Sequence, residues 1–245
     1  MRELCVHLKS KVDAFLDRED GDTVVKAIQS QVRIARDVID DALRRYRPEE
    51  LSLSYNGGKD CLVLLLLIIA SLPTHFPASS SSSAFPTSLQ ALYIRPLSPF
   101  SEVDAFVESS TSAYHLDLSV SNKPMKPALS DYLAERKTIK AVFVGTRRTD
   151  PHGARLTFFD ETDRDWPRFM RIHPVIDWHY REIWGFIRAM EIPYCPLYDM
   201  GYTSLGGTDD TYPNPALKVE DGKQDTFRPA YELTEDDEER LGRDR

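Results

Sequence analysis

Four short apolar runs recur along the chain, separated by segments with helical patterns. They are 51–54 (LSLS), 89–94 (LQALYI), 115–120 (HLDLSV) and 140–145 (KAVFVG). Apolar runs of this length between turn-rich stretches are typical of strands. Because helical segments alternate with them, the pattern predicts an α/β fold, with a parallel sheet that carries helices on both faces.

Helical patterns occupy most of the remaining chain. From Thr23 to Tyr46, apolar residues recur every three or four positions, with Asp22 or Thr23 as the expected N-cap. The almost wholly apolar segment from Asp60 to Leu72 predicts a buried helix that ends before Pro73. We also expect helices over 101–114, 126–139 and 177–190, and a short charged helix over 232–245.

Two stretches lack these patterns. Residues 73–88 are rich in Ser and Pro, which predicts a surface loop inside the domain, and residues 146–175 are loop-like and dense in charge and aromatic rings. A chain of 245 residues suits one large α/β domain. We therefore expect a single domain over 1–245, with an N-terminal helical region (1–47), a core (48–150) and a loop-rich C-terminal region (151–245).

Charge and cysteine usage narrow the class of protein. The net charge of −8 argues against broad contact with nucleic acid or an anionic membrane. Cys5, Cys61 and Cys195 form no CxxC pair, which fits a reducing compartment. The amino terminus lacks a signal-peptide pattern, and the longest apolar run (61–70) is about half the length that crosses a bilayer. We expect a cytoplasmic protein.

The segment SYNGGKD, residues 54–60, follows the first strand at the ligand-binding edge of such a sheet. We expect Gly57 and Gly58 to take positive φ and turn amide groups inward, toward the same point as the next helix dipole. An anion is the expected ligand. The spacing fits neither G-x-x-x-x-G-K-[ST] nor G-x-G-x-x-G. Helix capping alone is the alternative, but it does not explain paired glycines beside Asn56 and Lys59.

The turn after the fourth strand, GTRRTDPHGA, should reach the same edge of the sheet. Arg147 and Arg148 can neutralise phosphate oxygens, and Asp150 can bind magnesium or orient a phosphate. Taken alone, the turn could equally be a solvated charged loop.

Two later segments carry further candidates. In the first, Trp166 and Phe169 lie near Arg171 in sequence, a combination that suits a planar heterocycle bearing a phosphate. In the second, Arg240 and Arg243 stand three residues apart and so share one side of a helical turn. A charged segment of this kind is otherwise an ordinary solvated tail.

The loop at 54–60 resembles the S-G-G-x-D signature of the ATP pyrophosphatase loop. WPRFMR (166–171), DWHYREIW (177–184), PYCPLYDMGYTSLG (193–206), NPAL (214–217) and RPAYEL (228–233) accompany it in order. From Ser52 to Arg243 the chain therefore resembles the eukaryotic FAD synthases, which are FMN adenylyltransferases of the PAPS reductase-like family.

This resemblance implies an adenine nucleotide alpha hydrolase-like (Rossmann-like) fold in which 48–150 is the nucleotide-binding core and 151–245 comprises the flavin-binding region and the C-terminal tail. The implied reaction converts ATP and FMN into FAD and pyrophosphate with Mg²⁺, in a monomer whose partners are small molecules. Expected ATP contacts are Ser54, Tyr55, Asn56, Gly57, Gly58, Lys59, Asp60 and Ile94, to which we add Arg147. Expected FMN contacts are Asp163, Trp166 and Arg171. Expected catalytic residues are Asn56, Asp60, Asp150, Arg240 and Arg243, with Asp150 also the metal ligand.

Some points depart from that family pattern or stay open. Cys61 stands where many pyrophosphatase-loop proteins have Ser, and Asp160 and Asp163 could exchange roles. A PAPS or adenylylsulfate reductase shares the fold but needs a redox-active cysteine near its C-terminus, and Cys195 is the last cysteine here. A non-catalytic flavin- or nucleotide-binding module is the other alternative.

Overall fold

One six-stranded sheet organises the protein, whose computed structural model describes residues 1–19, 22–77, 85–219 and 226–243. The strand order is β3-β2-β1-β4-β6-β5, and all neighbours are parallel except β5 and β6. The strands are β1 (Leu51–Ser54), β2 (Leu89–Ile94), β3 (Leu116–Ser121), β4 (Ala141–Phe143), β5 (Phe159–Glu161) and β6 (Met170–Ile172). The predicted α/β fold with a largely parallel sheet is confirmed.

The two strands that the sequence did not predict lie in the segment expected to be a loop. Each has only three residues, too few to reveal an alternating pattern. The strand β6 pairs parallel with β4, and β5 returns antiparallel to β6. The C-terminal region therefore completes the sheet rather than standing apart from it.

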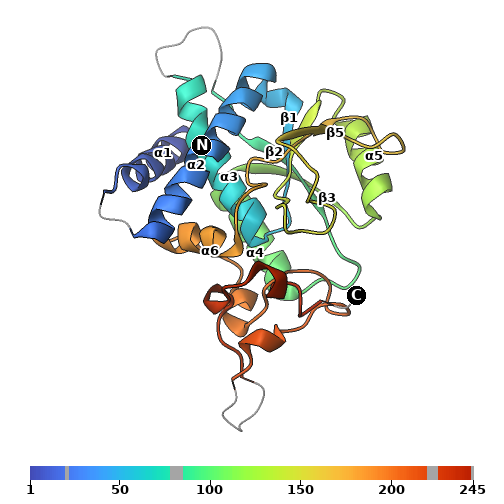
Figure 1. Ribbon diagram of the computed structural model, residues 1–245. Helices are drawn as coiled ribbons and strands as arrows, with labels where there is room; N and C mark the ends of the chain where they lie inside the picture. Colours follow the sequence, from blue (N-terminus) through green and yellow to red (C-terminus); the bar gives the residue numbers. More distant parts are fainter. Residues whose placement is uncertain (20–21, 78–84, 220–225, 244–245) are drawn as a thin grey trace.

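In the part of the chain that the structure describes, six α-helices accompany the sheet: α1 (Arg2–Leu16), α2 (Thr23–Arg45), α3 (Lys59–His75), α4 (Ser101–Ala113), α5 (Met125–Glu135) and α6 (Tyr180–Ala189). Figure 1 shows α5 on one side of the strands and α1, α2, α3 and α6 on the other. The expected N-cap of α2 is confirmed, because the Asp22 carboxylate accepts a hydrogen bond from the Val25 amide at 2.9 Å.

Helix α3 lies at the centre of the main core. Its residues 62–70 are at most 1% exposed, because the sheet covers one side and α1, α2 and α6 pack against the others. The prediction that this helix ends before Pro73 is wrong, since α3 continues to His75. A proline this close to the last turn removes a single backbone hydrogen bond, and the packing of a buried helix outweighs that loss.

Side chains that alternate along the strands point to opposite faces of the sheet and so belong to two separate hydrophobic cores. Leu53 and Phe143 face the main core, whereas Leu92 and Val142 face a smaller cluster under α5 that includes Tyr132. This alternation follows from the two-residue period of a strand. Both faces of the sheet are therefore covered, as the sequence predicted.

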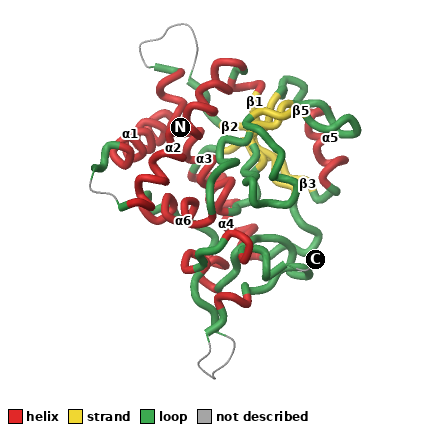
Figure 2. Tube along the Cα trace, viewed as in Figure 1, coloured by secondary structure: helices red, strands yellow, loops and turns green. Residues whose placement is uncertain are grey.

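The described parts of the C-terminal segment, residues 196–219 and 226–243, contain short 3-10 turns and connecting loops, drawn orange to red in Figure 1 and mostly as loop in Figure 2. The turns are Pro196–Met200, Pro215–Leu217, Ala230–Glu232 and Asp236–Glu238, and another, Pro48–Glu50, precedes β1. The predicted helix over 232–245 is wrong: hydrogen bonds there join residues three apart, as from the Arg243 amide to the Arg240 carbonyl. Residues 244–245 lie outside the described chain.

The central part of the serine-rich loop, 78–84, also lies outside the described residues. Its start differs from the prediction, because residues 73–75 belong to α3. Within the described chain, no helix combines the length and apolar character that crossing a membrane requires.

Candidate active site

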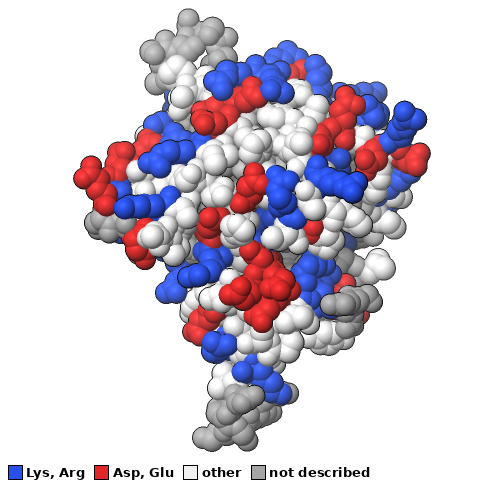
Figure 3. All heavy atoms as spheres, in the orientation of Figure 1, with Lys and Arg blue, Asp and Glu red and all other residues white. Residues whose placement is uncertain are grey.

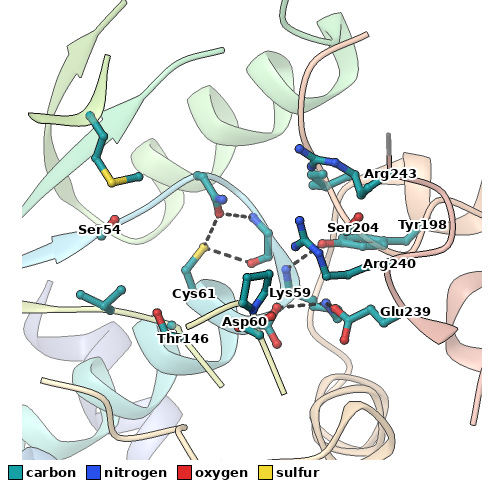
Figure 4. Close-up of a pocket in the computed structure, with 18 residues that line it drawn as sticks. Ser54, Lys59, Asp60, Cys61, Thr146, Tyr198, Ser204, Glu239, Arg240 and Arg243 are labelled. Atoms are coloured by element: carbon teal, nitrogen blue, oxygen red, sulfur yellow. Dashed lines mark hydrogen bonds and ion pairs between the residues drawn. The ribbon is translucent and has the colours of Figure 1, made fainter. Parts of the chain in front are cut away.

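A polar cavity of about 390 Å³ opens where β1 and β4 end, beside the N-terminus of α3 (Figure 4). The loop after β1, the turn after β4 and the C-terminal segment supply its walls. Its lining comprises Ser54, Asn56, Gly58, Lys59, Asp60, Cys61, Met125, Val144, Gly145, Thr146, Asp150, Pro151, Tyr198, Ser204, Leu205, Glu239, Arg240 and Arg243. The structure thus brings together the loop and the tail arginines that the sequence singled out.

The glycine loop is held in shape by its own side chains. Gly57 has φ +72°, a conformation that favours glycine, and a Cβ there would also lie 2.9 Å from Val107 Cγ2. Gly58 has φ −70°, so the prediction of positive φ at both glycines is wrong for the second. Asn56 Oδ1 accepts from the Gly58 amide at 2.9 Å and from Cys61 Sγ at 3.0 Å.

Two amide groups of the loop have partners within the protein, although only the Gly58 amide was expected to turn toward an anion. One is the Gly58 amide, bound to Asn56; the other is the Lys59 amide, which donates to the Tyr198 hydroxyl at 2.9 Å. The first turn of α3 still faces the cavity, with Gly145 so close that an added Cβ would lie 2.8 Å from the Cys61 amide nitrogen. The helix N-terminus therefore contributes a positive end dipole to the cavity.

A buried ionic network lies directly behind this loop. Lys59 Nζ is 2.5 Å from Glu239 Oε1 and 3.0 Å from Asp60 Oδ2. Arg147 Nε is 2.7 Å from Asp60 Oδ1, Arg147 Nη2 pairs with Glu239, and Arg147 Nη1 is 3.5 Å from Asp236 Oδ1. Lys59, Arg147 and Glu239 are 2%, 0% and 5% exposed, so the network is shielded from water.

The network favours the charged forms of Lys59, Asp60 and Arg147. Burial alone would lower the pKa of Lys59, but the Asp60 and Glu239 carboxylates outweigh it and hold that pKa above its ordinary value. Burial would raise the pKa of Asp60, yet Arg147 and Lys59 hold it below its usual range. The pKa of Arg147 is raised by Asp60 and Glu239 despite an opposing effect of burial.

Arg147 is therefore placed differently from the prediction. It was expected to contact ATP, but its side chain is fully buried behind the wall and does not line either cavity of the site. Its neighbour Arg148 turns toward the protein as well, because it pairs with Asp177 at 2.6 Å and donates to two carbonyls of its own loop. These two cations shape the turn after β4.

Asp150 lies at the end of that turn and borders the polar cavity. Its Oδ2 accepts a hydrogen bond from the Arg147 amide at 2.8 Å, and no other hydrogen bond or ion pair of its carboxylate occurs in the described chain. One oxygen is thus available to a ligand. The described residues hold no cluster of three or more metal-ligating side chains.

Arg240 and Arg243 face the glycine loop across the cavity (Figure 4). The Arg240 side chain is exposed and forms no hydrogen bond or ion pair with any described residue. Arg243 Nη2 pairs with Asp210 Oδ2 at 2.9 Å, while its buried Nε lacks a partner in the described chain. Gly206 lies against this side chain, because an added Cβ would stand 2.2 Å from Arg243 Nη1.

A second, apolar cavity of about 370 Å³ adjoins the polar one. The two share Ser54, Met125, Val144, Thr146 and Pro151, so they form one continuous cleft. The apolar cavity is completed by Ile94, Leu129, Val142, His152, Leu156, Thr162, Asp163, Trp166, Phe169, Arg171 and His173. The expected FMN contacts Asp163, Trp166 and Arg171 therefore lie in one wall with Ile94, which was expected to contact adenine.

The structure also shows where Asp160 and Tyr55, two further residues named from the sequence, lie. Asp160 does not line the apolar cavity, because its carboxylate accepts from the Thr157 amide and hydroxyl, whereas Asp163 does line it. Tyr55, expected to contact ATP, is 1% exposed and lines neither cavity. Its hydroxyl donates to Ser110 at 2.7 Å, so it packs under the loop instead.

The sequence interpretation missed several wall residues. Val144 and Thr146 follow β4 directly, so the rule that ligands bind at strand ends could have identified them. Tyr198 and Ser204 gave no such signal, since they come from a turn-rich stretch far along the chain. His173 is 1% exposed and also borders the apolar cavity. Burial, helped by Arg171, lowers its pKa to about 4.

Comparison with known proteins places the chain in a family. The phosphoadenosine phosphosulfate reductase domain model matches residues 50–135 and 122–213. A Schizosaccharomyces pombe protein named "Probable FAD synthase" is 44% identical over 216 residues, covering 88% of this chain and 80% of that protein. A Caenorhabditis elegans protein of the same name is 35% identical, and the chain spans 44% of its length.

The crystal structure of Candida glabrata FMN adenylyltransferase in complex with FAD and inorganic pyrophosphate is also similar. It superimposes with a TM-score of 0.89 at 28% identity, covering 98% of this chain and 97% of that one. The resemblance found in the sequence motifs is thus confirmed over nearly the whole chain. The chain belongs to the FAD synthase family within the phosphoadenosine phosphosulfate reductase domain group.

Proposed function

We propose that this protein transfers the AMP moiety of ATP to FMN, forming FAD and pyrophosphate. The observation that carries the proposal is the continuous cleft. A polar cavity with a helix N-terminus and two arginines joins an apolar cavity with Trp166 and Arg171, across the shared wall of Ser54 and Thr146. Such a cleft can hold a polyphosphate and a flat ring system side by side.

In this proposal the polar cavity holds the phosphates of ATP, and the apolar cavity holds the isoalloxazine ring against Trp166 and Arg171. The adenine ring lies toward Ser54 and Ile94, at the ends of β1 and β2. Phosphate oxygens would replace Asn56 Oδ1 as the acceptor for the Gly58 amide. This exchange is feasible because Asn56 is exposed and its side chain can turn away.

An oxygen of the FMN phosphate attacks the α-phosphorus of ATP and forms the new P–O bond. The bond from that phosphorus to the oxygen bridging to the β-phosphate breaks, and pyrophosphate leaves. No general base is needed, because the attacking phosphate is already ionised at neutral pH. The residues act by positioning and charge neutralisation: the α3 N-terminus, Arg240 and Arg243 stabilise the negative charge that builds on the leaving pyrophosphate.

The residues also fit a magnesium ion that arrives with ATP. Magnesium is commonly bound by one or two carboxylates together with substrate phosphates, and Asp150 offers one free carboxylate oxygen at the cavity wall. An ion bound there would neutralise phosphate charge. Asp150 would hold it, while the hydrogen bond from the Arg147 amide fixes the orientation of that carboxylate.

The structure argues against the reductase alternative. Cys195 is fully buried, and burial raises the pKa of its thiol to about 11, so little reactive thiolate forms at neutral pH. A non-catalytic binding module is the other alternative. It gives no reason for a free carboxylate oxygen at Asp150 and an unpaired side-chain cation at Arg240 in the lining of the same cavity.

One assay separates these functions. The purified protein is incubated with ATP, FMN and MgCl₂, and FAD and pyrophosphate are quantified by chromatography and a coupled assay. We expect equimolar FAD and pyrophosphate, and none with riboflavin, which lacks the attacking phosphate. Flavin binding without FAD formation would identify a binding module, and thioredoxin-dependent release of sulfite from PAPS would identify a reductase.

The proposed substrates are all small molecules. In the proposed division of labour, 48–150 is the nucleotide-binding core, and 151–245 holds the flavin-binding region together with the C-terminal tail, whose Arg240 and Arg243 reach the phosphates. Figure 3 shows basic and acidic side chains intermixed over the face in view, without the broad basic area that nucleic acid would need there. A monomeric state and a cytoplasmic location stay predictions from the sequence.

A further inference from the structure

The segment 236–243 carries both tail arginines, yet it has little secondary structure to fix its position. Its only regular element is the 3-10 turn Asp236–Glu238. Five acceptors in this segment are instead bound to residues far away in sequence: the carboxylates of Asp236 and Glu239, and the carbonyls of Glu238, Glu239 and Gly242.

Glu239 makes the most extensive of these contacts. One carboxylate oxygen binds Lys59 and the other binds Arg147, so a single side chain joins the glycine loop to the turn after β4. Its carbonyl accepts from the buried Thr203 hydroxyl at 2.6 Å. The side chain is 5% exposed, and the next residue, Arg240, projects into the polar cavity (Figure 4).

The two cations that Glu239 binds, Lys59 and Arg147, are not available to a ligand in this structure. The Lys59 ammonium is enclosed by Glu239, Asp60 and the Tyr180 ring, 5.2 Å from its centroid, and the Arg147 guanidinium is fully buried. Breaking one partner of a buried ion pair leaves an uncompensated charge and is strongly unfavourable. The two cations are therefore better suited to holding the tail than to binding a phosphate directly.

We propose that Glu239 is a positioning residue: it binds Lys59 and Arg147 so that the following arginines are held facing the glycine loop. This inference rests on the proposed function for its substrate, but it assigns a role to a residue outside the expected site. It also reassigns Lys59 and Arg147 from phosphate contacts to partners of the tail.

Pyrophosphate binding tests the inference without requiring FAD synthesis. We compare Glu239→Gln with a matched control, Glu238→Gln. Glu238 is the preceding residue, and its side chain makes no hydrogen bond or ion pair with the described residues. Isothermal titration with pyrophosphate and MgCl₂, at a temperature where circular dichroism shows each variant folded, should give at least ~10-fold weaker binding for Glu239→Gln. Glu238→Gln should match the wild type, and FMN binding should change by less than ~3-fold in both.

A second comparison distinguishes positioning from general stability. If Glu239 acts through the tail arginines, adding Glu239→Gln to the Arg240→Ala/Arg243→Ala variant should weaken pyrophosphate binding by less than ~3-fold more. If Glu239→Gln does not fold, Thr203→Val loosens the same segment by removing two buried hydrogen bonds, one to the Glu239 carbonyl and one from the Asn214 amide group, and it should show the same selective loss.

Unchanged pyrophosphate binding in folded Glu239→Gln or Thr203→Val would overturn the inference. So would a full, additive loss in the triple variant. The proposed function fails separately, if the wild type binds pyrophosphate but forms no FAD from ATP and FMN.

Discussion

Glu239 Oε1 lies 2.5 Å from the ammonium of Lys59, a residue 180 positions earlier in the chain. This contact joins the helix start that follows the glycine loop to the segment carrying Arg240 and Arg243. The two halves of the polar cavity are thus joined by the buried Glu239 side chain, which also pairs with Arg147, and cavity variants can be chosen to test each half.

Asp150→Asn should lower the rate of FAD formation at least ~100-fold. The amide oxygen of the new Asn can still accept the hydrogen bond from the Arg147 amide. It carries no negative charge, however, to bind the magnesium ion that accompanies the polyphosphate. The melting temperature should change by less than a few degrees, as should that of the control Asp37→Asn, an exposed residue of α2. Near-normal turnover in Asp150→Asn would rule out its proposed role.

Arg243→Ala should reduce turnover at least ~10-fold, which corresponds to about 1.4 kcal/mol of activation free energy. Gly206→Ala should have a similar effect, because the added methyl would lie 2.2 Å from Arg243 Nη1 and displace that flexible side chain. Steady-state kinetics of the double variant provide the check: if Gly206→Ala acts through Arg243, the two losses should not add. Additive losses would show that Gly206 acts by another route.

Trp166→Ala should weaken FMN binding at least ~10-fold, because the ring supplies flat apolar area to the cavity shared with Arg171. Trp166→Phe keeps an aromatic face and should lose less. Quenching of FMN fluorescence measures the flavin affinity, and pyrophosphate binding should stay within ~3-fold of the wild type. Equal loss of both ligands would indicate a general collapse of the cleft.

His173 should make the free energy of unfolding depend on pH between about 4 and 6.5. Burial lowers its pKa to about 4 in the folded protein, against an ordinary value of 6.5. Within this interval the unfolded chain binds the proton and the folded chain does not, so stability falls as the pH falls and the loss levels off below 4. The full effect is roughly 3 kcal/mol.

Urea denaturation at several pH values measures this contribution. The stability of His173→Gln should fall less steeply than that of the wild type between pH 6.5 and 4, whereas His7→Gln, which alters an exposed histidine, should follow the wild type. Parallel curves for His173→Gln and the wild type would mean that this histidine is not held neutral.

The sequence by itself determined the alternation of strands and helices, the parallel sheet and the position of the glycine loop. These features are local: an apolar run of four to six residues, a helical period or a pair of glycines is complete within a few positions. Family motifs likewise identified Arg240 and Arg243 before any contact was known, although the helix expected around them did not form.

Only the tertiary structure decided which charged groups face the cavity. Arg147 and Asp150 are three residues apart, yet the first is buried in an ionic network and the second borders the cavity. That difference depends on Glu239 and Asp236, which lie about ninety residues farther along the chain. A side chain's charge is a local property, but its available partners depend on burial and distance, and these are set only when remote segments pack together.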